Sequence, residues 1–231
     1  VPKLAISSER FEALSLHFSG RAWALEKIDQ WLSDKGPSHY LLTGGPGSGK
    51  SALSARLVQL SQGQVAAPEY PNLGSGIMIY AHFCEVNVPD LLSPLRFIEN
   101  LSAALADRYT EFSEALVEIT QRESRVTVHS SPVQQIENVV ETGVTIIGTT
   151  VRISIGGLSM RLAFDLAVRE PLQRAYEKGL DERILILVDG LDEAITYDEQ
   201  LNLVALLKDA VRLPEQVRFL YTSRPDDQVL D

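Results

Sequence analysis

A glycine-rich octapeptide carries the residues of this chain best suited to binding a phosphate group. Residues 44–51 have the sequence GGPGSGKS, which fits the pattern G-x-x-x-x-G-K-[ST]. Glycines allow backbone N–H groups to converge on phosphate oxygens, and the N-terminus of a following helix adds a favourable dipole. Lys50 can reach the β- and γ-phosphates, and the Ser51 hydroxyl can ligate Mg²⁺. The candidate nucleotide-binding residues are Gly44, Gly45, Pro46, Gly47, Ser48, Gly49, Lys50, Ser51 and Ala52.

The elements around this loop favour phosphate binding over its alternative, a simple glycine-rich turn. Residues 40–42 form a short apolar run that is typical of a buried strand, and residues 52–58 have the pattern of a helix. A strand, the motif and a helix in this order are the context that the motif requires.

A second cluster of chemically active residues follows the apolar run at 184–188. An uninterrupted run of this kind predicts a central parallel strand, because both of its faces are covered. Asp189 then lies at the carboxyl end of the strand, beside the phosphate loop, where it can support Mg²⁺ through water. Asp192 and Glu193 are near enough in the sequence to orient or deprotonate an attacking water. The alternative is a solvated acidic turn.

Two arginines complete the set of candidates. Arg224 follows the last apolar run, 217–221, and can stabilise charge on a γ-phosphate; the alternatives are a surface arginine, or Ser223 as the polar sensor. Near the N-terminus, Gly20 and Arg21 can let the backbone lie against an adenine ring. A turn at the start of a helix explains these two residues equally well.

The other elements alternate between helices and strands. Apolar spacing predicts helices at about 21–35, 52–58, 89–105, 112–119, 160–178 and 201–211, and apolar runs predict strands at 40–42, 77–83, 184–188 and 217–221. Pro171 marks a kink or a fresh start in its helix. The prediction is an α/β, three-layer P-loop NTPase fold with a parallel central sheet. We count about four core strands, and we expect a longer natural chain to supply a fifth.

The pattern changes to a period of two before the helix at 160. Val144, Ile146, Val151, Ile153 and Ile155 alternate with polar residues around a turn at residues 148–150. This alternation predicts a β-hairpin inserted at about 126–157. An arm that packs on the sheet edge and an arm that packs on a neighbour are both compatible with it.

Length and composition describe one globular domain, with an N-terminal segment and helix at 1–36 and a nucleotide-binding core at 37–231. The net charge of −10 argues against a nucleic-acid partner. No apolar stretch approaches the about 20 residues that span a membrane, and early charges disfavour a signal peptide. The single cysteine, Cys84, rules out an intrachain disulfide, fits a cytoplasmic setting and is interpreted as a core residue.

Taken together, the motifs resemble the NACHT-type branch of the STAND class of P-loop NTPases, which are relatives of the AAA+ ATPases. The resemblance extends in order over most of the chain, and its most specific element is DGLDE. The matching segments are FSGR at 18–21, GGPGSGKS at 44–51, YAHFC at 80–84, ILILVDGLDEA at 184–194 and FLYTSRP at 219–225.

The resemblance implies an ATP-driven signalling switch within a larger bacterial multidomain protein. It implies ATP, ADP and Mg²⁺ as cofactors, self-association of the nucleotide-bound form, and effector and sensor domains outside this segment. It assigns phosphate and Mg²⁺ binding to Lys50 and Ser51, and support of Mg²⁺ to Asp189. Ala22 stands where the family often has an acidic residue, so the contacts of Gly20 and Arg21 with the base stay open.

The resemblance also assigns the catalytic roles. Glu193, with Asp192 as the second candidate, would position the water, and Arg224 would be the sensor arginine. The resulting hypothesis is a slow ATPase that acts as a switch, with GTP as the alternative nucleotide. The chain contains no Asn-Lys-x-Asp element after any strand, which favours ATP. A scaffold that binds nucleotide with negligible hydrolysis and a small-molecule kinase are the competing hypotheses.

Overall fold

The computed structural model describes residues 2–16, 18, 20–122, 126–132, 149–155, 157–198, 201–209, 212–225 and 229. These residues form two compact units. Unit 1 comprises the described parts of Val1–Ser93, Glu182–Lys208 and Glu215–Asp231, and unit 2 those of Pro94–Asp181 and Asp209–Pro214. Each unit is described by itself.

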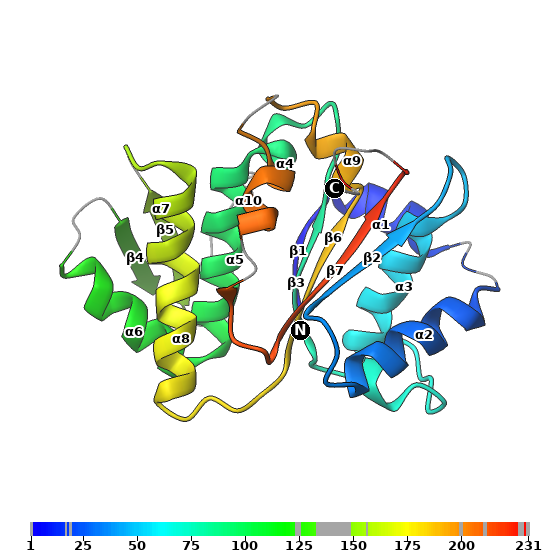
Figure 1. Ribbon diagram of the computed structural model, residues 1–231, viewed down its shortest axis with the longest axis horizontal. Coiled ribbons are helices and arrows are strands. Elements are labelled where there is room, and N and C mark those ends of the chain that lie inside the picture. Colours follow the sequence, from blue (N-terminus) through cyan, green and yellow to red (C-terminus); the bar gives the residue numbers. More distant parts are fainter. Residues whose placement is uncertain are drawn as a thin grey trace. The chain divides into compact units, whose positions relative to one another are not determined.

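Unit 1 contains a parallel five-stranded sheet. The strands lie in the order β1-β3-β6-β7-β2, and every neighbouring pair is parallel (Figure 1). Helices flank the sheet, which confirms the predicted α/β class and is consistent with a three-layer fold of the P-loop NTPase type. The strands are β1 (Lys3–Ala5), β2 (His39–Thr43), β3 (Met78–Phe83), β6 (Ile184–Asp189) and β7 (Val217–Ser223).

The centre of the sheet follows directly from the sequence. Every residue of β3, β6 and β7 is buried, as a continuous apolar run between two covered faces requires. The strand β2 lies at an edge instead, and its residues are only partly buried or exposed. The predicted strand at 40–42 therefore exists, but the prediction that it is buried was wrong.

The count of about four strands was also wrong, because β1 is a fifth. It pairs with β3, and Leu4 lies opposite Ala81 in the register. Three residues of mixed character, Lys3–Ala5, are too few to show a period of two, so local pattern could not reveal this strand. Its pairing with β3, more than 70 residues away, defines it.

Helices of unit 1 occupy most of the predicted positions. The helix after the phosphate loop, α3, begins at Lys50 and buries apolar residues such as Leu53 and Leu57. Trp23, an aromatic residue of α2, is 56% exposed. The helices are α1 (Ser8–Ser15), α2 (Ala22–Ser33), α3 (Lys50–Ser61), the 3-10 turn η1 (Pro71–Leu73), α4 (Pro89–Leu92), α9 (Leu191–Ala194) and α10 (Leu203–Asp209), whose last residue belongs to unit 2.

The structure shifts the limits of two predicted helices. The helix expected at 89–105 is interrupted, because Ser93 is extended (ψ 120°), as the residue before Pro94 prefers to be. The helix expected at 201–211 begins at Leu203, since the side chain of Asn202 caps it by accepting a hydrogen bond from Ala205 N at 3.0 Å. Val211 lies outside the described residues, as does Leu230 near the expected end of the core.

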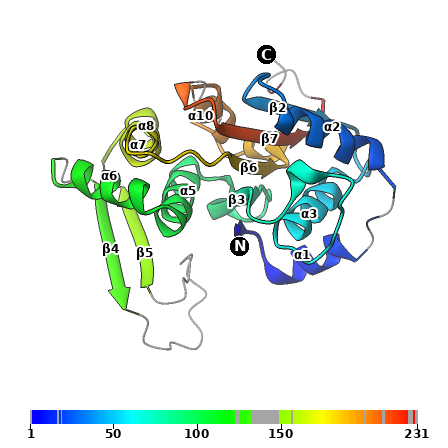
Figure 2. The ribbon, with the colours of Figure 1, turned by 90° about the horizontal axis from the view of Figure 1, so that it is seen from below.

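Unit 2 combines helices with an antiparallel hairpin (Figure 2). The hairpin lies within the predicted interval 126–157, but the turn expected at 148–150 was wrong, because Thr149 and Thr150 belong to β5. Val144 and Ile146 lie outside the described residues. The elements are α5 (Pro94–Arg108), α6 (Thr110–Thr120), β4 (Val126–Pro132), β5 (Thr149–Ile155), α7 (Met160–Phe164), the π-helical segment η2 (Asp165–Arg169) and α8 (Glu170–Glu177).

Pro171 lies in the first turn of α8, and η2 precedes it. Proline has no N–H to donate to the carbonyl four residues earlier, which is that of Ala167. The hydroxyl of Ser102 donates to this carbonyl at 2.6 Å and satisfies it. The helical run therefore continues past Pro171. Among the helices in the described part of the chain, none is both long and apolar enough to cross a membrane.

Candidate functional site

The carboxyl ends of the strands bring two loops to one edge of the sheet. In the register, Thr43 lies opposite Ser223, and Phe83 lies opposite Asp189. The N–H of Gly44 donates to the carbonyl of Ser223 at 3.2 Å. We call Gly44–Ser51 the glycine tip and Asp189–Glu193 the acidic tip. They lie at the carboxyl ends of β2 and β6, which are separated in the sheet by β7 alone.

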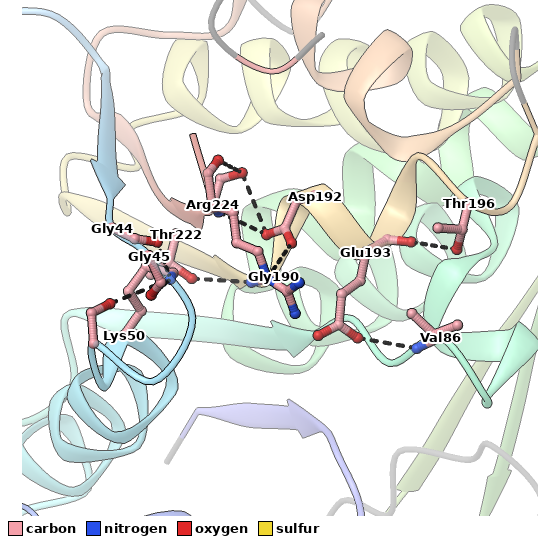
Figure 3. A network of polar contacts seen from close by, with 12 residues as sticks. Gly44, Gly45, Lys50, Val86, Gly190, Asp192, Glu193, Thr196, Thr222 and Arg224 are labelled. Carbon is pink, nitrogen blue, oxygen red and sulfur yellow. Dashed lines mark hydrogen bonds and ion pairs between the residues drawn. The ribbon is translucent and has the colours of Figure 1, made fainter. Parts of the chain in front are cut away.

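The glycine tip folds into a turn that only glycine adopts without strain. Gly47 and Gly49 have φ angles of 72° and 80°, in the left-handed region. Lys50 bends back onto this turn, where its Nζ donates to the carbonyls of Gly44 at 2.6 Å and Gly45 at 3.2 Å (Figure 3). The ammonium group is thus held on two backbone carbonyls at the start of the glycine tip.

Arg21 also contacts the glycine tip. Its Nε and Nη2 donate to the carbonyl of Ser48 at 3.1 and 2.7 Å, and a Cβ at Gly49 would overlap its guanidinium group. Arg21 itself has a φ of 62°, next to Gly20 at 72°. Both residues were expected on the base side of a nucleotide. The structure places the Arg21 side chain on the glycine tip, a contact that sequence spacing does not reveal.

At the acidic tip, two buried hydroxyls hold Asp189. Ser54 Oγ and Thr222 Oγ1 donate to its Oδ1 at 2.7 and 2.6 Å, while Oδ2 is buried and has no hydrogen-bond partner among the described residues. Within the described residues, no hydrogen bond joins Asp189 to Ser51. The residue of α3 that contacts Asp189 is Ser54, one turn further on.

Ser54 and Thr222 were not predicted from the sequence, although each carried a signal. Residues three apart lie on the same face of a helix, so Ser54 follows Ser51 along α3. Thr222 immediately precedes the predicted Ser223–Arg224 pair at the end of β7. Neither signal identifies Asp189 as the partner, because the contacts join residues 135 and 33 positions apart.

Asp192 binds the predicted sensor arginine. Its Oδ1 accepts from the backbone N–H of Arg224 at 2.9 Å, and its Oδ2 lies 3.2 Å from Arg224 Nε. Ser223 Oγ lies 3.4 Å from the same Oδ1. The side chain of Asp192 is only 13% exposed, whereas that of Arg224 is 54% exposed. The backbone contact therefore fixes the carboxylate, while the guanidinium group stays largely open to solvent.

Glu193 turns to a different partner. Its Oε2 accepts from the N–H of Val86 at 3.1 Å, as Figure 3 shows, and Glu85 beside it forms an ion pair with Arg10 at 2.6 Å. The turn that places α9 requires a left-handed residue, which Gly190 supplies with φ 73°. The structure thus separates the two carboxylates: Asp192 faces β7, and Glu193 faces the segment after β3.

Burial keeps two ionisable groups near the acidic tip, Cys84 and His82, uncharged. Burial raises the pKa of the Cys84 thiol well above its ordinary value, and Asp189, Glu193 and Asp192 raise it further, so the thiol stays protonated. Cys84 is fully buried, which confirms it as a core residue. Burial lowers the pKa of His82 to about 4, and the ring is neutral between the hydroxyl of Tyr80 and the carbonyl of Leu91.

The donor set suits Mg²⁺ better than a metal caged by protein. Within the described residues, His, Cys, Asp and Glu side chains form no group of three that could hold a metal ion. Mg²⁺ keeps several waters and is usually bound through one or two carboxylates and substrate phosphates. The buried, unpartnered Oδ2 of Asp189 can accept from a metal-bound water, and the Ser51 hydroxyl at the start of α3 is the candidate direct ligand.

Comparison with known families identifies one relationship. The family model described as Nephrocystin 3, N-terminal, matches residues 21–159, more than half of the 231 residues. The chain belongs to this family. The match to the Nephrocystin 3 N-terminal family includes Arg21 and the glycine tip, and it ends before β6. Neither the curated proteins nor the solved structures searched contain a match to the chain.

Proposed function

We propose that this member of the Nephrocystin 3 N-terminal family is an ATP-binding, slowly ATP-hydrolysing switch domain. We place it with the NACHT-type STAND NTPases, as part of a larger bacterial multidomain signalling protein that works in the cytoplasm. Nucleotide state would control self-association, and effector and sensor domains would lie outside this segment. The observation that carries the proposal is the meeting of the glycine tip and the acidic tip at one sheet edge, where Ser54 of α3, the helix that continues from the glycine tip, donates to Asp189 at 2.7 Å.

In this proposal the glycine tip binds the triphosphate. Backbone N–H groups of the loop and the N-terminus of α3 face the anion, and Lys50 exchanges the carbonyls of Gly44 and Gly45 for phosphate oxygens. For the ammonium group, a charged phosphate oxygen is a stronger hydrogen-bond acceptor than a neutral backbone carbonyl. Nucleotide binding would therefore release Lys50 from its present contacts.

The acidic tip supplies the hydrolytic groups. Bound Mg²⁺ would neutralise charge on the phosphates, with Ser51 and Asp189 as its protein contacts. Glu193 would orient the attacking water and Arg224 would stabilise charge on the γ-phosphate. To take these roles, Glu193 must leave the Val86 N–H or share its carboxylate with water, and Arg224 must turn from Asp192.

Those contacts favour one competing function, a nucleotide-binding scaffold with negligible hydrolysis. Both Glu193 and Arg224 are occupied by protein partners in the structure. If these contacts persist with nucleotide bound, Glu193 could not activate the attacking water and Arg224 could not stabilise charge on the γ-phosphate. The two functions differ in whether bound nucleotide is converted.

A single-turnover assay separates them. The protein is mixed in excess with radiolabelled ATP and Mg²⁺, and bound ATP, ADP and free phosphate are followed over time. The switch ATPase predicts slow conversion of bound ATP to ADP without any acceptor. Bound ATP that never converts supports the scaffold, and no binding of ATP contradicts both. Competition by unlabelled GTP compares the affinity of the protein for GTP with its affinity for ATP.

A further inference from the structure

Two hydroxyl groups donate hydrogen bonds to the buried carboxylate of Asp189, and their arrangement is unusual. Ser54 is fully buried and Thr222 is 2% exposed, and both donate to the same oxygen, Oδ1. The other oxygen, Oδ2, is equally buried and receives no donor from the described residues. A buried acceptor left without a donor costs free energy, so a fold normally distributes its donors over both oxygens.

The direction of the Thr222 hydroxyl is fixed by a second contact. Its Oγ1 accepts a hydrogen bond from the N–H of Gly190 at 3.0 Å, so its single proton is free to point at Asp189. Gly190 is the left-handed residue that begins the turn into α9. Thr222 therefore connects the carboxylate of Asp189 to the turn that carries Asp192 and Glu193.

Three elements contribute to this arrangement. Ser54 comes from α3, Asp189 from the end of β6 and Thr222 from β7. The two donors come from different elements and both bind Oδ1, which leaves Oδ2 as the atom that can accept a further hydrogen bond. A donor for that oxygen has to come from outside the described protein, and a metal-bound water is such a donor.

We propose that Ser54 and Thr222 are positioning residues, which hold Asp189 so that Oδ2 accepts from a water bound to Mg²⁺. This inference rests on the proposed function, since it needs an Mg²⁺–nucleotide complex at the glycine tip. The two hydroxyls would touch neither metal nor nucleotide. Loss of an outer-shell partner of this kind typically weakens metal binding or activity by about 10–100-fold.

The test measures ATP affinity with Mg²⁺ and with EDTA in wild type, Ser54→Ala, Thr222→Val and Thr222→Ser. Thr222→Val keeps the shape of the side chain without the hydroxyl, and Thr222→Ser keeps the hydroxyl. We expect Ser54→Ala and Thr222→Val to bind ATP about 10–100-fold more weakly than wild type with Mg²⁺, with affinity unchanged in EDTA. Thr222→Ser should retain the wild-type values in both conditions.

Other outcomes overturn the inference in recognisable ways. Wild-type Mg²⁺ dependence in Ser54→Ala and Thr222→Val would show that the hydroxyls do not position Asp189 for the metal. An equal loss with Mg²⁺ and with EDTA would assign them a purely structural role, and a thermal-unfolding scan of each variant without nucleotide would measure it. Wild type that binds no ATP in either condition would overturn the proposed function itself. If the wild type binds ATP but the variants do not behave as expected, the inference fails and the proposed function stands.

Discussion

The glycine tip and the acidic tip lie at the ends of two strands of one sheet, but their polar groups are held in different ways. At the glycine tip the chemistry lies in the backbone, on an edge strand, and Lys50 rests on carbonyls of its own loop. At the acidic tip it lies in side chains after a fully buried strand, and each carboxylate has a partner from a distant segment. A local motif suffices for the first kind of site, whereas the second depends on the fold.

The largest effect is expected from the glycine tip. Lys50→Ala removes the only side-chain cation that the motif directs at the β- and γ-phosphates, so we predict that it abolishes measurable ATP binding. Truncating one partner of a hydrogen-bonded charge pair costs about 2–5 kcal/mol, which is more than about 30-fold in affinity. Equilibrium binding of radiolabelled ATP measures it. Lys178→Ala, which removes an exposed ion pair with Glu118 in unit 2, is the matched control. Wild-type affinity in Lys50→Ala would contradict the role of the loop.

The acidic tip should affect turnover rather than binding. Glu193→Gln keeps an oxygen for the Val86 N–H but loses the ability to take a proton, so we predict ATP binding near wild type and hydrolysis slower by about 10²–10⁴-fold. Single-turnover conversion of bound ATP checks the rate. Unchanged hydrolysis would remove Glu193 from the mechanism, and a parallel loss of binding would remove the contrast between the two tips.

A buried histidine on β3, the strand beside β6, should make the free energy of unfolding depend on pH. His82, on β3, is buried and neutral with a pKa of about 4, below its ordinary value of 6.5. Between these values the unfolded chain binds a proton that the folded protein excludes. The contribution is therefore complete above about pH 6.5 and is lost as the pH falls towards 4, by about 3 kcal/mol in total.

Urea unfolding at pH 7 and at pH 4.5 measures this loss. The variant His82→Gln removes the titrating group, so its free energy of unfolding should fall less than that of wild type over the same interval. Other groups that titrate there are common to both proteins and cancel in the difference. Equal pH dependence in the two proteins would contradict the assignment.

The smallest expected effect tests how the backbone shapes the glycine tip. Gly49→Ala places a Cβ at a φ of 80° and against the Arg21 guanidinium, so we predict a loss of stability of about 1–2 kcal/mol. Thermal unfolding checks it. Gly36→Ala, whose added Cβ would come no nearer than 4.0 Å to Asp34 Cβ, is the control and should change the midpoint little. Equal midpoints would show that the loop tolerates another shape.

The same contrast explains how much the sequence could predict. The apolar run at 184–188 specifies a buried strand by local rules, and the motif at 44–51 specifies a glycine-rich turn that leads into a helix; both elements are present. The strand β1 and the pairing of Ser54 with Asp189 depend on segments far apart in the chain. No local period encodes such contacts, so the fold class was predictable and the partners within the site were not.

Backbone amide NMR can test directly whether the two tips share one ligand. The ¹⁵N-labelled protein is titrated with Mg²⁺ and a non-hydrolysable ATP analogue, and the resonances of Gly49 and Gly190 are followed together. We predict that both resonances shift with the same dissociation constant, because both tips face one triphosphate and its metal. A shift of Gly49 with Gly190 unchanged, or two different constants, would contradict a shared site.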